Sequence, residues 1–432
     1  MTSHRLTSAL KRLDALINWE RRSRHDMERD LGPVEDVLER LGNPELAWAG
    51  VLVAGTKGKG SVSALIAAAM GRAGLRVGRY ASPHVERVTE RVIVDGEEVD
   101  EELLGEALEA ALTAREAALA EGTAGGAATW FDLMTAAAFL IFAWGEVEWA
   151  IVEVGIGGRL DSTNTVDPVV GVVTNIDLEH TLVLGDTRAE IAAEKGAIMG
   201  PGTVLITGVD EDDEEAWEPL AQIAENCDGR LVSIPQSGGF DLRNRALSEA
   251  VLNELGACGV KSRDGAPLWR SFLDAEAVRG ASLPARAERF TVSGVPILLD
   301  SGHVASSAEL LLEQLERDPE LGRKPKLIVA LGREKHANAV LKAFADRVDR
   351  CQCTTAPEGR LLEAEELAEL AHEAGHDEPE AWEDPLEALR EAILDAEQGG
   401  GWVLVFGSFY LSGALRAELV RASVADGTDR TC

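Results

Sequence analysis

Short apolar runs alternate with helix-like segments twice along this chain, and this alternation constrains the fold more than any other feature. In the first half, helix-like segments separate five predicted strands, at residues 47–54, 75–80, 149–154, 169–176 and 204–207. These runs are almost continuously apolar, which is typical of strands buried on both faces of a parallel sheet. The pattern therefore predicts an α/β domain with a doubly wound, mostly parallel sheet, whose ligands bind at the carboxyl ends of the strands.

A second α/β alternation follows a weakly patterned region. Its predicted strands are Pro296–Leu299, Lys326–Leu331, Asp349–Thr354 and Trp402–Phe406, and its predicted helices lie near 305–316, 336–347, 363–375, 384–397 and 411–422. We place a domain boundary between Leu283 and Gly294. The first predicted domain, residues 1–290, contains N-terminal helices and the first sheet, and residues 291–432 form a second, Rossmann-like α/β domain.

A turn rich in glycine and lysine joins the first predicted strand to an alanine-rich helix. Its residues are Gly55, Thr56, Lys57, Gly58, Lys59, Gly60 and Ser61. Glycines let the backbone approach an anion, and the N–H groups and dipole at a helix start favour phosphate. Lys59 would then be the counter-charge of the phosphates. A turn that binds nothing is the alternative, but two lysines in one turn of so acidic a chain favour a phosphate loop.

Acidic residues far outnumber basic ones, which restricts the partners of the chain. Asp and Glu number 75 against 42 Lys and Arg, so the net charge is −33. We therefore expect neither a nucleic acid nor an anionic membrane as partner, and a phosphate ligand must be attracted by local positive charge and metal ions. The five cysteines show no Cys-x-x-Cys spacing, which speaks against a disulfide framework or a zinc site. No apolar run reaches the roughly 18 residues of a membrane span and no signal-peptide pattern opens the chain, so we expect a cytoplasmic protein.

Three ionisable residues of the first domain stand at predicted strand ends or on an apolar helix face. Glu153 ends an apolar strand before a run of glycines, where a carboxylate suits a divalent cation opposite the phosphate loop. His180 also follows a strand, although a lone histidine is more often structural. Lys195 lies beside Glu194 on an apolar helix face. An ion pair with Glu194 and a functional lysine that faces the phosphate site explain it equally well.

The second half offers two further candidates for ligand contact. Arg286 carries a guanidinium group, whose planar fork suits phosphate. Asp300 and His303 lie in one turn after a predicted strand, where a carboxylate and an imidazole suit a ribose or a substrate. These signals gain weight only in combination with the rest of the chain.

Taken together, the motifs resemble the Mur ligase superfamily and, within it, the folylpolyglutamate synthase/dihydrofolate synthase family. The similar segments follow the family order over nearly the whole chain: Ile17–Glu20, Leu41–Pro44, Gly55–Ser61, Ser82–His84, Glu90–Arg91, Glu153–Asn164, Glu179–His180, Leu184–Thr187, Ile191–Lys195 and Gly407–Leu411. As an ordered set, these motifs are specific to the family.

The resemblance implies an ATP-binding domain followed by a C-terminal Rossmann-like glutamate ligase domain. ATP would phosphorylate the carboxylate of dihydropteroate, of a reduced folate, or of both. The amine of L-glutamate would then attack the acyl phosphate, giving an amide, ADP and phosphate. This chemistry agrees with a phosphate loop, because phosphoryl transfer depends mainly on positioning and charge neutralisation. We expect a monomer with small-molecule substrates.

The resemblance also assigns roles in the first domain. The phosphate loop, with Lys59, would hold the triphosphate of ATP. Ser82 and Glu153 would bind one Mg²⁺, and His180 would bind a second. Lys195 matches a lysine that is carbamoylated in this family, which turns a cation into a carboxylate-like metal ligand.

Further roles concern the nucleotide and the second domain. Asn244 and Arg286 match ATP-contacting positions of the family. Asp300 and His303 match a second-domain motif on the nucleotide and acceptor side. The residues implied to act in catalysis are Lys59, Glu153, His180, Lys195 and His303.

Three segments depart from the family pattern, and in one of them Lys195 is followed by Gly-Ala rather than Ala-Gly. Before Asn244 the family usually reads His-Gln, where this chain has Phe240 and Asp241, and the family sequence Asp-Gly-Ala-His-Asn-Pro is Asp-Ser-Gly-His-Val-Ala at residues 300–305. The triphosphate and metal motifs are intact. Two alternatives to the folate ligase therefore stay open: a related ligase with another pterin or carboxylate acceptor, and a nucleotide-binding protein without ligase activity. The retained metal motifs speak against the second.

Overall fold

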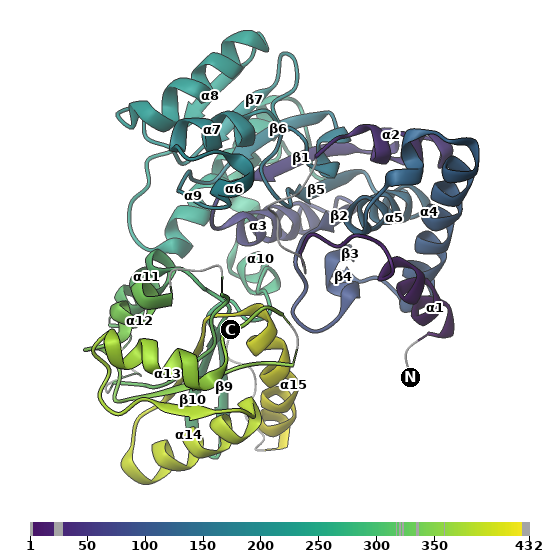
Figure 1. Ribbon diagram of the computed structural model, residues 1–432. Coiled ribbons are helices and arrows are strands. Elements are labelled where there is room, and N and C mark those ends of the chain that lie inside the picture. Colours follow the sequence, from purple (N-terminus) through teal and green to yellow (C-terminus); the bar gives the residue numbers. More distant parts are fainter. Residues whose placement is uncertain are drawn as a thin grey trace. The chain divides into compact units, whose positions relative to one another are not determined.

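The computed structural model describes residues 3–20, 29–316, 318, 321, 324–333, 337–357 and 359–425. Within these residues the chain forms two compact units, which we call unit 1 (residues 1–83 and 88–281) and unit 2 (residues 84–87 and 282–432). Each unit contains one sheet with helices on both faces (Figure 1). Residues 84–87 therefore belong to unit 2, although the chain on either side of them belongs to unit 1.

The sheet of unit 1 has the strand order β4-β3-β2-β5-β1-β6-β7-β8 in the described part of the chain. Its strands are β1 Ala49–Ala54, β2 Val77–Tyr80, β3 Val92–Val94, β4 Glu97–Glu98, β5 Trp149–Glu153, β6 Pro168–Val173, β7 Val204–Thr207 and β8 Arg230–Ser233. Strand β3 pairs antiparallel with both β2 and β4, and the remaining pairs are parallel. The carboxyl ends of the parallel strands consequently lie along one edge.

Helices cover both faces of this sheet. One face carries α1 His4–Leu13, α2 Gly32–Arg40, α4 Glu101–Glu121, α5 Trp130–Trp144, α7 Arg188–Gly196 and α8 Glu214–Asn226, and the other carries α3 Lys59–Arg72, α9 Phe240–Ala257 and α10 Ala275–Gly280. Helix α6, Thr181–Leu184, is a single turn, and 3₁₀ turns span Pro44–Ala47, Val88–Arg91, Ala124–Ala127, Ser162–Thr165 and Arg270–Phe272. Successive residues of β1 pack into the hydrophobic cores on opposite faces of the sheet. Leu52 packs into the core on the face of α5, and Val53 packs into the core on the face of α3. The unit is therefore doubly wound, as predicted.

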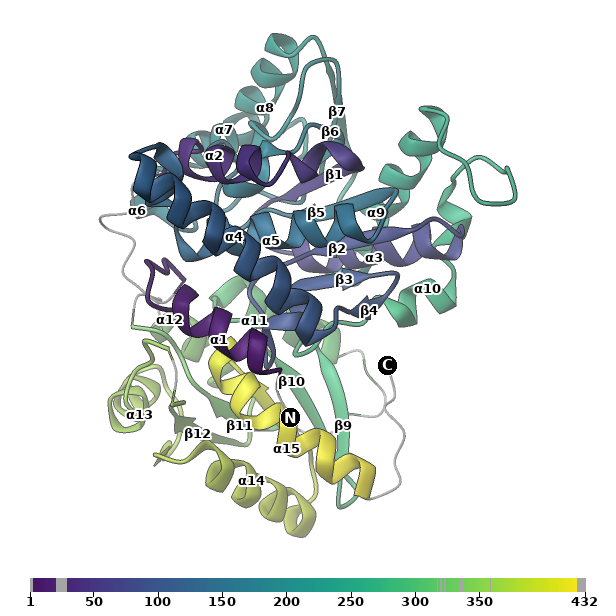
Figure 2. The same ribbon diagram turned by 90° about the vertical axis from the view of Figure 1, so that its right-hand side faces the viewer.

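Unit 2 is a smaller version of the same design, with the strand order β13-β12-β11-β14-β10-β9. The strands are β9 Glu288–Val292, β10 Val295–Asp300, β11 Lys326–Val329, β12 Arg350–Thr354, β13 Glu380–Trp382 and β14 Val403–Phe406. Helices α11 Ala305–Leu315, α12 Ala337–Phe344 and α13 Ala364–Glu373 cover one face, and α14 Pro385–Gly399 and α15 Phe409–Ala425 cover the other. Helix α15 runs along the antiparallel β9–β10 hairpin (Figure 2).

The observed architecture confirms the predicted fold class, an α/β protein with a doubly wound sheet and a second Rossmann-like sheet. Several short or weakly patterned elements were not predicted: β3, β4, β8, β9, β13, α8, α9 and α10. Residue 336, the predicted start of the helix that begins at Ala337, lies outside the described residues. In the described part of the chain, no helix is long and apolar enough to cross a membrane.

Candidate active site

Four neighbouring strands of unit 1 end at the same edge of the sheet and carry the predicted site residues. Their order is β2-β5-β1-β6, and all three pairs are parallel. Strand β2 leads to Ser82, Glu153 is the last residue of β5, β1 leads to the phosphate loop, and β6 leads to His180. The topology thus brings the predicted phosphate and metal residues of unit 1 to one edge, which is where such sheets bind ligands.

Two glycines set the shape of the phosphate loop. Gly55 has φ +140° and Gly58 has φ +83°, a region that residues with a side chain rarely adopt. A Cβ atom on Gly55 would lie 1.9 Å from the hydroxyl oxygen of Thr174, and one on Gly58 would lie 2.4 Å from Oδ1 of Asn244. Asn244 of α9 is therefore packed directly against the loop, beside the start of α3. Both glycines are required by backbone conformation and by their close neighbours.

The loop after β6 holds the first half of the phosphate loop through a series of hydrogen bonds. The backbone N–H of Thr56 donates to the carbonyl oxygen of Asn175 at 3.0 Å, and that of Lys57 donates to Oδ1 of Asn175 at 2.9 Å. The Thr174 hydroxyl donates to the carbonyl oxygen of Lys57 at 2.5 Å. The N–H of Asp177 donates to the Thr56 hydroxyl at 3.0 Å. Hydrogen bonds within unit 1 therefore define the conformation of residues 55–57.

Two lysine ammonium groups converge on the carbonyl oxygen of Gly55. Nζ of Lys195 donates to it at 2.8 Å and Nζ of Lys59 at 3.1 Å. Lys195 is only 2% exposed. Burial and the positive charge of Lys59 lower the pKa of Lys195 to about 7, although the negative charge of Glu179 opposes this. A substantial fraction of Lys195 is therefore a neutral amine near neutral pH.

The neighbour of Lys195 is engaged elsewhere. Glu194 accepts hydrogen bonds from Arg29 at 2.9 Å and from Arg159, whose Nη2 lies at 2.7 Å from Oε1. Gly158 packs on the end of α7, where a Cβ would meet the carbonyl oxygens of Glu194 at 2.5 Å and of Lys195 at 2.9 Å. The structure thus favours the second explanation of Lys195, a lysine that faces the phosphate loop.

A buried carboxylate fixes the glycine run after Glu153. Asp161 accepts from the N–H of Ile156 at 2.9 Å and from the N–H of Thr163 at 3.1 Å. Burial raises the pKa of Asp161, and the hydrogen bonds that it accepts oppose this. Ser162 donates to Asp132 of α5, which ties the same turn to the covering helix. The sequence motif contained Asp161, but only the structure shows this role.

The predicted metal ligands offer a donor set that suits Mg²⁺. Glu153 is 6% exposed. Burial lowers the pKa of Arg79 on β2, and the negative charge of Glu153 offsets this only in part. Glu153 therefore interacts electrostatically with the strand that leads to Ser82, and carboxylate and hydroxyl oxygens are hard ligands of the kind that Mg²⁺ prefers. His180, at φ +54°, starts α6.

The described residues do not form an all-protein metal cage, since no three His, Cys, Asp or Glu side chains among them gather as a metal site. Mg²⁺ is commonly held by one or two carboxylates together with substrate phosphates, so the few donors at the strand ends fit a metal that arrives with a nucleotide.

Two of the predicted residues of unit 2, Arg286 and His303, lie beside one aromatic ring. The guanidinium carbon of Arg286 lies 4.8 Å from the ring centre of Phe409, and the His303 ring lies 6.3 Å from it. Asp300 accepts from the N–H of Ala287 at 2.8 Å and of Gly302 at 2.7 Å, so it shapes the turns that carry Arg286 and His303. Phe409 was not predicted as a site residue, although it lies in the motif Gly407–Leu411.

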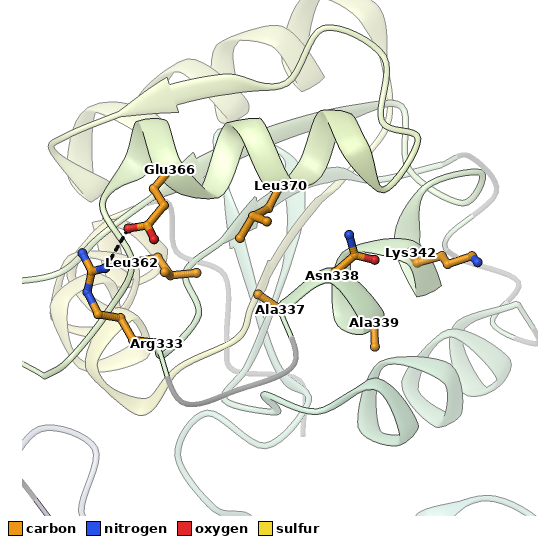
Figure 3. A pocket seen from close by; sticks show the side chains of 8 residues that line it. All are labelled: Arg333, Ala337, Asn338, Ala339, Lys342, Leu362, Glu366 and Leu370. Carbon is orange, nitrogen blue, oxygen red and sulfur yellow. Dashed lines mark ion pairs between the residues drawn. The ribbon is translucent and has the colours of Figure 1, made fainter. Parts of the chain in front are cut away.

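A separate hollow of about 600 Å³ lies between α12 and α13 of unit 2 (Figure 3). Arg333 and Glu366 form an ion pair of 2.9 Å at one end, and Lys342 points away at the other. Its lining contains none of the predicted site residues. Its polar groups do not converge on a common point, so we assign no chemistry to it.

Comparison with known proteins agrees with this geometry. The family described as "Mur ligase, glutamate ligase domain" matches residues 285–409. The dihydrofolate synthase/folylpolyglutamate synthase of Escherichia coli is 31% identical over 403 residues, which cover 89% of this chain and 90% of that protein. A crystal structure of the bifunctional enzyme of that name from Yersinia pestis, complexed with AMPPNP and Mn, superposes with a TM-score of 0.76. It is 27% identical, and the match covers 97% of this chain and all of that one.

The similarity to one longer relative covers only part of each protein. The probable bifunctional folylpolyglutamate synthase/dihydropteroate synthase of Haloferax volcanii is 33% identical over 306 residues, which cover 62% of this chain. The matched part is 34% of that protein, so the similarity covers about a third of its length.

The fold and the site define the class of Mur-type ligases. Unit 1 has a glycine- and lysine-rich loop on a doubly wound sheet, with acidic and basic groups at the neighbouring strand ends, and unit 2 matches a glutamate ligase domain. Within this class, the chain belongs to the folylpolyglutamate synthase/dihydrofolate synthase family.

Proposed function

We propose that this chain is an ATP-dependent ligase that joins L-glutamate to the carboxylate of dihydropteroate, of a reduced folate, or of both. The observation that carries the proposal is the set of four neighbouring strand ends that bear Ser82, Glu153, the phosphate loop and His180. The name of the Escherichia coli relative and the AMPPNP and Mn in the Yersinia pestis structure support it.

The chemistry needs a strong activating group, because a carboxylate does not react with an amine while its oxygen is a poor leaving group. Transfer of the γ-phosphoryl group of ATP to that oxygen gives an acyl phosphate. Attack by the glutamate amine then forms the amide and releases phosphate. The protein contributes positioning and neutralisation of charge.

In our proposal, the phosphate loop positions the triphosphate and neutralises its charge. Its backbone N–H groups at the start of α3 bind the phosphates, and Lys59, which now donates to the Gly55 carbonyl at 3.1 Å, turns to the triphosphate. Asn244, packed on Gly58, orients the nucleotide beside the loop. The remaining loop residues supply close backbone approach and hydroxyl groups.

Two Mg²⁺ ions would neutralise the charge that develops between the β- and γ-phosphates. Ser82 and Glu153 would hold the first and His180 the second, while a carbamoylated Lys195 would add a negative ligand. The low pKa of Lys195 supports this modification, because only the neutral amine combines with CO₂.

For unit 2 we propose contact with the nucleotide and the acceptor through Arg286, Asp300 and His303. The assignment of nucleotide binding to residues 1–290 and of glutamate ligation to residues 291–432 stays a prediction, as do a monomeric state and a place in the cytoplasm.

The test is phosphate release by the purified protein with ATP, Mg²⁺ and L-glutamate. We expect release only when dihydropteroate or tetrahydrofolate is also present. Omission of L-glutamate should stop net turnover and product formation. Binding of ATP without turnover on either acceptor would contradict the proposal.

A different acceptor is the second candidate, and one observation favours it. Phe240 and Asp241 replace the usual His-Gln at the start of α9, next to the helix turn that bears Asn244. Activity with another pterin or carboxylate, together with silence on both folate acceptors, would decide for this candidate.

A further inference from the structure

Lys57, one of the two lysines of the phosphate loop, is turned toward a carboxylate of its own unit. Its Nζ donates to Oε1 of Glu179 at 2.7 Å. Both side chains are largely buried, Lys57 with 17% and Glu179 with 11% of its surface exposed. An ion pair of this length and burial is not a solvated surface contact, and removal of either partner would leave the other charge buried and unpaired by it.

The ion pair completes the grip of the β6 loop on the phosphate loop. Asn175 binds the backbone N–H groups of Thr56 and Lys57, and Thr174 binds the Lys57 carbonyl. Glu179 adds a bond to the side chain of the same lysine. Lys57 is thus held at its N–H, its carbonyl and its ammonium group by a single segment, residues 174–179.

Glu179 is also the counter-charge of a cluster of cations. Burial raises the pKa of Glu179, but the positive charges of Lys57, His180 and Lys59 outweigh it and hold that pKa well below its usual range. Glu179 immediately precedes His180, so the ion pair ties the phosphate loop to the segment that presents the proposed metal ligand. Asp177, Arg188, Asp213 and Lys195 are further charged groups in this network.

We propose that Glu179 is a positioning residue for nucleotide binding, which acts by holding Lys57 as an anchor of the phosphate loop. Lys57 then shapes the loop, and Lys59 is left as the lysine whose ammonium meets the phosphates. The sequence analysis names Lys59 as the counter-charge of the phosphates, and the ion pair with Glu179 gives Lys57 a separate role within the same loop.

The inference rests on the proposed function only in its assumption that the loop binds a nucleotide. The suitable probe is therefore MgADP without acceptor or glutamate, and the readout is its affinity in calorimetry. Glu179→Gln and Lys57→Met each remove one charge of the pair, and the double variant removes both. We expect each single variant to weaken MgADP by about tenfold, and the double variant to be no weaker than the weaker single one, because all three remove the same anchor.

A matched control exists in the same unit. Arg40 and Asp36 of α2 form an ion pair of the same 2.7 Å length and similar burial, with 21% and 17% exposed. Asp36→Asn should lower the thermal stability and leave MgADP affinity unchanged. If Glu179→Gln does not fold, Glu179→Asp keeps the charge at a greater distance, and it should weaken MgADP in the same direction by a smaller factor.

Two results would overturn the proposal. If Lys57→Met weakens MgADP while Glu179→Gln leaves it unchanged or tighter, Lys57 is a direct phosphate ligand. If both variants behave like Asp36→Asn, the pair serves stability alone. Unaltered protein that binds no MgADP would overturn the proposed function as well, whereas unaltered protein that binds MgADP but releases no phosphate would overturn only the proposed function.

Discussion

Three candidate residues of unit 1 are buried more deeply than the candidate residues of unit 2. Glu153, Lys195 and Asn244 are all less than 9% exposed and lie on separate elements around one sheet edge. Arg286 is exposed, and the group around it depends on one ring and on the turns that Asp300 caps. Side chains that are already fixed in place can stabilise the charge that develops during phosphoryl transfer without rearranging. More exposed side chains suit contacts that form when substrates bind.

The motifs of the chain are divided unevenly between the two units. The triphosphate and metal motifs lie in unit 1 and are intact, whereas the altered segments are Phe240 and Asp241 in unit 1 and residues 300–305 in unit 2. We infer that the reaction class is encoded mainly by unit 1. Substitutions in the two units should therefore differ in size.

The largest loss is expected from the charged groups at the unit 1 edge. Glu153→Gln and Lys195→Ala should each reduce turnover by about a thousandfold or more, since each removes a proposed negative ligand that neutralises the phosphates through the metal. Phosphate release measures the effect, and an unchanged unfolding temperature shows that the fold persists. Near-normal rates in both variants would remove the metal assignment and, with it, the contrast between the units.

The second expected effect is a pH dependence in the recovery of turnover, set by the protonation of Lys195. Its pKa of about 7 means that the ammonium form dominates below pH 7 and the neutral amine above. At a fixed CO₂ concentration, protein freed of CO₂ should regain turnover about tenfold faster at about pH 8 than at about pH 6, in proportion to the neutral amine. Equal rates of recovery, or full turnover without CO₂, would contradict carbamoylation.

The same pKa predicts how stability changes with pH. The lowered pKa means that the unfolded chain holds more protons than the folded one between about pH 7 and the ordinary value of 10.5. The unmodified protein should therefore become more stable as the pH rises through this window. Denaturant unfolding of Lys195→Met, which cannot titrate, should lack this increase.

A smaller loss is expected from the ring of unit 2. Phe409→Leu removes the surface under Arg286 and beside His303, and should raise KM for ATP about fivefold, in line with the strength of a cation–π contact. Phe409→Tyr retains the ring and serves as the control. A loss as large as that of Glu153→Gln would show that unit 2 is as firmly involved in the chemistry as unit 1.

The smallest effect should be common to both units. The net charge of −33 produces repulsion that salt screens. Raising KCl from low to about 1 M should therefore raise the unfolding temperature by about 3 °C, a modest change for a protein of this size. Scanning calorimetry would detect it. A fall in the unfolding temperature would show that surface ion pairs outweigh the repulsion.

The sequence was sufficient for the strongly patterned parts of this molecule. The strand before Gly55 and the helix after it were predicted because an apolar run, a glycine turn and an alanine-rich segment each carry a local signal. Helix α9 was not, because its apolar positions are interrupted by Arg243 and Arg245, yet it brings Asn244 to the loop. Short antiparallel strands such as β4, with two residues, carry too little pattern to recognise.

Several site contacts depend on strand order, which local pattern does not contain. Asn175 and Glu179 are ordinary polar residues after a strand, and they reach the phosphate loop only because β6 lies next to β1. Phe409 is apolar, as core residues usually are, so its type alone does not indicate a site. Its contact with Arg286 joins positions that are more than a hundred residues apart in the sequence. Such contacts emerge only when the topology is known.

The fate of one oxygen atom tests the account most directly. The acceptor is labelled with a heavy oxygen isotope in its carboxylate and incubated with the protein, ATP, Mg²⁺ and L-glutamate, and the released phosphate is analysed by mass spectrometry. Activation as an acyl phosphate predicts that one labelled oxygen appears in each phosphate released. Turnover that leaves all of the label in the organic product or in water would contradict the account.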